Sequence, residues 1–90
     1  MATYFIKIAE KAGDGVGLTG MVMKGILKDS MKANIEGKTA SIERMGRRNP
    51  KSMRVEWMKE AKEKEIVQVM IKGVDFETVK KYQGKNVEFA

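Results

Sequence analysis

Residues 38–58 restrict the fold more than any other part of the chain, because two stretches of alternating polarity flank a turn. Apolar and polar side chains alternate in Lys38–Met45 (KTASIERM) and in Met53–Met58 (MRVEWM). Alternation with a period of two is typical of a half-buried strand. Gly46–Ser52, between the two stretches, contains an Asn-Pro turn dipeptide, whose proline has no backbone N–H for a strand ladder. We therefore predict a β-hairpin and, with it, a sheet.

This hairpin carries nearly all of the net charge. Residues 44–54 hold five cations and no acid, whereas the other 79 residues hold 13 lysines and 12 acids, a net of +1 out of the total of +6. All the arginines lie in this stretch, and a guanidinium pairs bidentately with phosphate and stacks on rings, which an ammonium does not. The predicted binding element consists of Arg47, Arg48 and Lys51 at the tip of the hairpin, with Arg44 and Arg54 on its two arms.

Three further strands are predicted around the hairpin. Alternation and β-branched or aromatic residues favour strands at Thr3–Ala9, with Ile6 and Ile8 facing inward, and at Asn86–Phe89. Ile66–Lys72 (IVQVMIK) is almost continuously apolar, as a central strand would be.

Two helices are also predicted. Met21–Asn34 has apolar side chains spaced three to five residues apart, and Gly37 follows as a possible terminator. A strand over residues 20–27 is the competing interpretation, because an interior glycine costs a helix about 1 kcal/mol relative to alanine. The second helix is short, is capped by Asp75 and ends at Gly84.

These elements predict an α+β fold in one domain spanning residues 1–90. It would contain a small, twisted, mostly antiparallel sheet of about five strands, one helix after a glycine-rich loop and a short C-terminal helix. If residues 20–27 form a strand, the alternative is a small barrel that resembles the oligonucleotide-binding type. A chain of this length builds a modest core, which a homodimer would extend.

The composition argues against several classes of function. The chain has no cysteine, hence no disulfide and no thiolate metal site, and no histidine, the commonest general base and metal ligand near neutral pH. We expect no catalytic residues, no cofactor and no metal. The sequence shows no charged leader and no apolar run near the roughly 20 residues of a membrane span. These features predict an intracellular, cytoplasmic protein without a membrane partner.

The cation cluster predicts an anionic partner. A two-stranded ribbon fits a major groove, and a basic loop can follow a single strand. We therefore expect a non-enzymatic accessory protein that binds nucleic acid by its phosphates, with a salt slope near −4.5 on duplex DNA if five phosphates are contacted, at ~0.9 per phosphate. The alternative is a protein-interaction module, an inhibitor or adaptor that docks the arginine hairpin on an acidic protein surface.

The only tryptophan, Trp57, bears on the form of nucleic acid. An exposed indole could stack on unpaired bases, at about 1–3 kcal/mol per base, which would favour a single strand. Its parity with Met53 and Val55 instead favours an inward position that anchors the hairpin to the core. We expect the inward position and keep stacking as the alternative.

A glycine-rich loop, Glu10–Gly20, is the second candidate site. Gly15-Val16-Gly17-Leu18-Thr19-Gly20 matches the dinucleotide-binding pattern G-x-G-x-x-G. Four residues separate it from the preceding strand, Asp14 adds a negative charge, and 90 residues are too few for a full dinucleotide fold. The loop is expected to close on a bound polymer. Amides at the helix start could bind a single phosphate of that polymer. A third function class is a small phosphate or nucleotide binder that uses the same glycine-rich loop. The candidate residues are Gly15, Gly17, Thr19 and Gly20.

Overall fold

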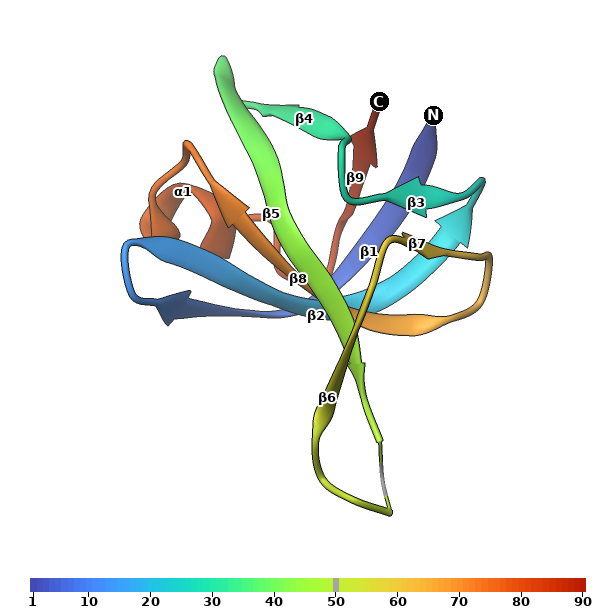
Figure 1. Cartoon of the computed structure of the whole chain (residues 1–90). Coiled ribbons are helices and arrows are strands. Elements are labelled where there is room, and N and C mark those ends of the chain that lie inside the picture. Colours follow the sequence, from blue (N-terminus) through green and yellow to red (C-terminus); the bar gives the residue numbers. More distant parts are fainter. Residues whose placement is uncertain (50) are drawn as a thin grey trace.

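The computed structural model describes residues 1–49 and 51–90, and it is nearly all sheet. Strands hold 62% of the residues and helix only 6%, so the expected α+β fold with two helices is wrong. Six strands form a nearly closed, barrel-like sheet, which agrees with the barrel alternative. Figure 1 shows this barrel with both termini at one end and a hairpin projecting from the other.

The described residues form nine strands and one helix. The strands are β1 (Ala2–Ala12), β2 (Gly15–Lys24), β3 (Leu27–Lys28), β4 (Lys32–Ile35), β5 (Lys38–Arg48), β6 (Val55–Met58), β7 (Glu60–Ala61), β8 (Ile66–Lys72) and β9 (Asn86–Phe89), and the helix is α1 (Phe76–Lys80). The barrel follows the order β4-β5-β8-β2-β1-β9, and every pairing in it is antiparallel. The short β3–β7 pair stands apart from this sheet.

The barrel closes where β9 returns to β4. The backbone N–H of Lys32 donates to the carbonyl of Ala90 at 2.9 Å, and the N–H of Ala90 donates back to Lys32 at 2.8 Å. Without closure, β4 and β9 would be the edges of the sheet, and an unpaired edge invites association with other chains. Closure gives each of these strands a partner.

The predicted helix over Met21–Asn34 is wrong, because these residues form the end of β2, then β3 and most of β4. The buried residues of β2 alternate as Val16, Leu18, Gly20 and Val22. The strict alternation in β2 therefore determines the structure, although the looser spacing of the apolar residues after it resembles one face of a helix. Gly37 does not end a helix; with Glu36 it forms the turn between β4 and β5, where both residues have positive φ.

Gly20 allows β1 and β2 to approach each other closely. A Cβ at Gly20 would overlap the carbonyl oxygen of Phe5 on β1 and lie 3.1 Å from the Tyr4 ring. The fully buried Tyr4 side chain crosses the interior at this point, and its hydroxyl donates to the carbonyl of Val67 on β8 at 2.8 Å. Burial raises the pKa of the Tyr4 phenol above its ordinary value of 10.0. One side chain thereby links β1, β2 and β8.

A bulge in β1 changes which of its residues face inward. Ile6 lies opposite Gly20 and Ile8 lies opposite Thr19, so Lys7 is an extra residue in β1. Ile6 is buried as expected, but Ile8 is 41% exposed because the extra residue reverses the alternation. The inward position expected for Ile8 is therefore wrong.

The short C-terminal helix α1 forms where Asp75 caps it. The Asp75 carboxylate accepts from the backbone N–H of Thr78 at 3.1 Å and from its hydroxyl at 2.7 Å. Lys38, which follows the β4–β5 turn, donates to the same carboxylate at 2.8 Å. The contact with Lys38, followed by those with Thr78, holds the pKa of Asp75 well below its ordinary 3.8.

We expect Gly20→Ala to lower the free energy of unfolding by about 1–3 kcal/mol, since the added methyl group meets backbone atoms that cannot move aside. Gly17→Ala in the same strand is the control. Its nearest contact would be an ordinary 3.4 Å to the Met70 sulfur, so we expect a change within about 0.5 kcal/mol. Denaturant unfolding measures both, and equal effects would contradict the close approach at Gly20.

We expect Asp75→Asn to lower Tm at neutral pH, because asparagine keeps the cap but loses the charge that Lys38 contacts. The pKa of Asp75 is depressed in the folded state, so its contribution is present above about pH 3.8 and is lost as pH falls through the folded-state pKa. The Tm difference between wild type and variant should therefore shrink in acid. A difference that is constant from pH 7 to about pH 2 would contradict this account.

Candidate anion-binding surface

The predicted hairpin is present and extends beyond the barrel. β5 pairs with β8 and β4 inside the barrel, and its last part, Met45–Arg48, pairs with β6 as the projecting ribbon of Figure 1. Its turn is displaced from the predicted Gly46–Ser52, because β5 runs on to Arg48 and β6 begins at Val55, which leaves Arg54 in the turn. Arg47 and Arg48 therefore lie on a strand arm, not on the tip.

A bulge at Glu43 points Arg44 outward. Ile42 lies opposite Ile71 and Arg44 lies opposite Met70, so Glu43 is an extra residue in β5. Without it, Arg44 would share the inward parity of Ile42. With it, Met45 is buried and Arg44 is exposed.

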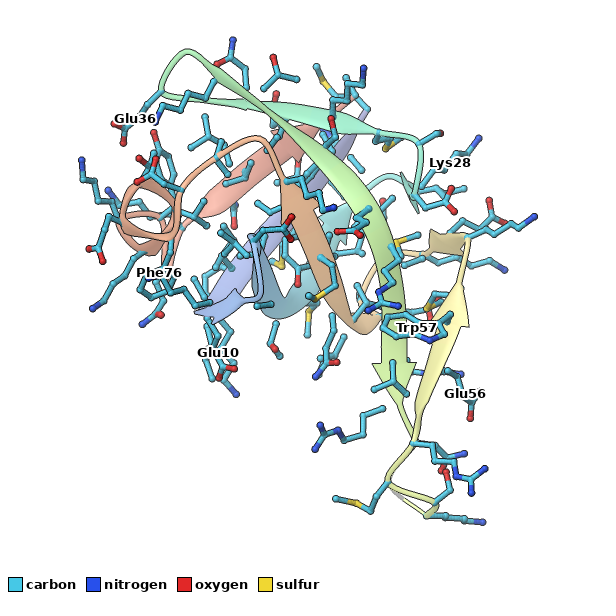
Figure 2. The ribbon with its side chains drawn as sticks, turned by 60° about the vertical axis from the view of Figure 1, so that its left-hand side comes forward. Glu10, Lys28, Glu36, Glu56, Trp57 and Phe76 are labelled. Atoms are coloured by element: carbon cyan, nitrogen blue, oxygen red, sulfur yellow. The ribbon has the colours of Figure 1, made fainter. Side chains whose placement is uncertain are left out.

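Trp57 lies on the outer face of the hairpin, so the expected inward position is wrong. It is 54% exposed, and Figure 2 shows its ring against β5 at the base of the ribbon. Trp57 is directly opposite Gly46, where a Cβ would come within 2.9 Å of the indole. The Arg44 guanidinium lies over the ring, 4.3 Å from its centroid. Gly46 thus leaves room for the indole, and Arg44 stacks on it.

Register places two arginines on the face that carries Trp57. Arg48 lies opposite Val55 and Gly46 lies opposite Trp57, so Arg44, Gly46 and Arg48 share that face. Arg47 lies opposite Glu56 on the other face, and its guanidinium is 3.6 Å from the Glu65 carboxylate. Figure 2 shows Glu56 pointing away from Trp57. The hairpin therefore has one face without acids and one face where acids accompany the arginine.

Asn49 organises the tip with four hydrogen bonds. Its N–H donates to the Arg54 carbonyl and its carbonyl accepts from Met53, both at 2.8 Å. Its side chain accepts from the N–H of Lys51 at 2.9 Å and donates to Glu56 at 2.8 Å. Pro50 of the predicted turn lies outside the described residues. Lys51 and Arg54 are both exposed.

The ion pairs leave most of these cations available. Among the described residues, Arg47 is the one member of the predicted cluster with a carboxylate within 4.0 Å. Several lysines elsewhere, at Lys38, Lys72 and Lys81, contact acids. Arg44, Arg48, Lys51 and Arg54 therefore have no carboxylate within 4.0 Å among the described residues.

The glycine-rich segment is a strand and not a loop. Gly15, Gly17, Thr19 and Gly20 all belong to β2, which pairs with β1 on one side and β8 on the other. A helix start with free amides, which the phosphate-binding hypothesis required, does not form there. Gly13 and Asp14 form the two-residue turn before it, with positive φ at Gly13. Thr19 faces outward and borders the hollows beside Arg48.

Within residues 1–49 and 51–90, no three potential metal ligands of the His, Cys, Asp or Glu type gather into a site. In the same residues, no helix has the length and apolar character needed to cross a membrane. The Arg44–Trp57–Arg48 face is the candidate site on its geometry. No known family model and no curated protein sequence matches the chain.

We expect the indole fluorescence of Trp57, the only tryptophan, to be quenched by acrylamide in the native state nearly as strongly as in the unfolded state, because more than half of the side chain is exposed. Trp57→Ala should then cost the fold only about 1 kcal/mol, since it removes a surface cation–π contact. Strong protection from acrylamide, or a loss of about 3–5 kcal/mol typical of a core tryptophan, would contradict the exposed position.

Proposed function

We propose that this protein binds single-stranded nucleic acid through the Arg44–Trp57–Arg48 face of its projecting hairpin. The observation that carries the proposal is the half-exposed indole with an arginine stacked on it and acids absent from its face. Bases of a single strand are open to stacking, whereas bases inside a duplex are not.

Two kinds of contact support the proposal, and they act on different parts of the ligand. Arg48, Lys51 and Arg54 lie along the hairpin without carboxylate partners, as phosphate-binding groups require. The indole and the Arg44 guanidinium offer planar surfaces to a base, and both kinds of plane stack on bases. A surface that binds anions by charge alone has no need of these stacking planes.

The competing proposal is an acidic protein surface as the partner of the same hairpin. Charge alone fits both partners, so the role of Trp57 separates them. Stacking on bases makes the indole important for affinity but leaves the dependence on salt unchanged. We further propose that the protein is not an enzyme and acts inside the cell, as the sequence predicts.

We expect a labelled oligonucleotide of about 12 thymidines to bind at about 50 mM salt and to weaken at about 200 mM, with a slope near −2 for the three phosphate contacts of Arg48, Lys51 and Arg54 at ~0.7 each. Arg44→Ala with Arg48→Ala should weaken binding and bring the slope to about −1.5. Trp57→Ala should weaken binding roughly 5- to 100-fold with an unchanged slope. Fluorescence anisotropy measures all three.

Lys80→Ala with Lys81→Ala is the matched control, because it removes two positive charges at α1, away from the hairpin. We expect a small effect that disappears at the higher salt. Absence of binding at about 50 mM salt, or equal losses in the control and the arginine variant, would contradict the proposed function. Binding that depends on the arginines but not on Trp57 would favour an acidic protein partner.

A further inference from the structure

The outer face of the barrel continues directly from the hairpin. Ile8 lies opposite Thr19, Thr19 opposite Gln68, Gln68 opposite Gly46, and Gly46 opposite Trp57. These outward residues form one row across β1, β2, β8, β5 and β6. At about 4.8 Å between strands, the row extends roughly 19 Å from Ile8 to Trp57.

Two parallel rows flank this one. On one side, Phe5 lies opposite Met21 and Met21 opposite Ile66. On the other side, Glu10 lies opposite Gly17, and Met70 lies opposite both Gly17 and Arg44. Glu10 is the one acid in the three rows and stands at the corner farthest from Trp57. Small, polar and apolar side chains thus cover a face that becomes cationic toward the hairpin.

A hollow of about 400 Å³ lies in the Phe5 row. Its walls are almost entirely apolar, with Phe5, Met21, Met23 and Ile66 around it and Lys7 at its border. Ile66 is 60% exposed, a large fraction for an isoleucine in a strand. An aromatic ring, apolar walls and a nearby ammonium suit a nucleobase that is attached to a phosphate.

A second hollow joins the first to the hairpin. Thr19 and Ile66 border both hollows, and the second is also lined by Arg47, Arg48 and Lys64. A polymer held at Arg48 therefore meets two adjoining hollows that lead to Phe5. Thr19 and Gln68 supply hydrogen-bonding groups along it.

We propose that a single strand bound at the hairpin continues across the outer face of β8, β2 and β1, and that one of its bases occupies the hollow beside Phe5. This inference rests on the proposed function and adds to it a second base site and a direction for the strand. It predicts a footprint longer than the hairpin, because the path crosses four strand spacings.

The test compares thymidine oligonucleotides of about 4 and about 12 nucleotides on wild type and on Met21→Gln with Ile66→Gln. The wild-type protein should bind the longer oligonucleotide with a higher affinity than its greater length alone would explain. The double variant should lose roughly tenfold in affinity for the longer oligonucleotide and almost nothing for the shorter one, which the hairpin alone can hold. Arg44→Ala with Arg48→Ala should weaken both.

Ile26→Gln is the matched control, because Ile26 is 45% exposed and does not border the hollow. This variant should bind both oligonucleotides with the same affinity as the wild-type protein. Circular dichroism establishes that each variant is folded. Abasic substitution scanned along the longer oligonucleotide gives a second readout on the unmodified protein, where we expect two separate sensitive positions.

The two proposals fail in different ways. If wild type binds both lengths and the double variant loses nothing on the longer one, or if abasic scanning finds one sensitive position, the second base site is wrong while the hairpin site stands. If wild type binds neither oligonucleotide at low salt, both proposals are wrong.

Discussion

The close approach of β1 and β2 at Gly20 fixes the register on which the rest of the structure depends. Tyr4 passes over Gly20 and donates to the Val67 carbonyl, so one buried side chain holds three strands in a single alignment. A slip of one residue would turn every side chain of β2 to the opposite face. The same internal constraint therefore places Thr19 and Met21 on the outside, in line with β8 and the hairpin.

Two local irregularities determine the character of the outer face. The extra residues Lys7 and Glu43 reverse the alternation of their strands, which exposes Ile8 in one case and Arg44 in the other. Gly46 then leaves room for Trp57, and Arg44 stacks on the indole. Stacking and charge are combined on one acid-free face, while Arg47 and its acidic neighbours lie on the other.

The sequence predicts the cationic hairpin but not the orientation of its side chains. The charge count and the alternation around the turn identified the hairpin, and the cap at Asp75 identified α1. The predicted helix over Met21–Asn34 is wrong because the strict alternation in β2 outweighs the loose apolar spacing of the residues after it. The Gly13-Asp14 dipeptide, a recognised two-residue hairpin turn, was an available signal for that strand. The outward positions of Arg44 and Trp57 depend on the Glu43 bulge and on the pairing with Gly46, which the sequence pattern does not reveal.

The proposed binding face is probed residue by residue in an amide-resolved NMR titration with a single-stranded oligonucleotide of about 12 nucleotides. We expect the largest shifts at the indole N–H of Trp57 and at the amides of Gly46 and Arg48, with smaller ones at Gln68 and Thr19. The amide signals around Asp75 and α1 should keep their chemical shifts. Shifts confined to α1 and the β4–β5 turn, or none at saturating oligonucleotide, would contradict the proposed binding face.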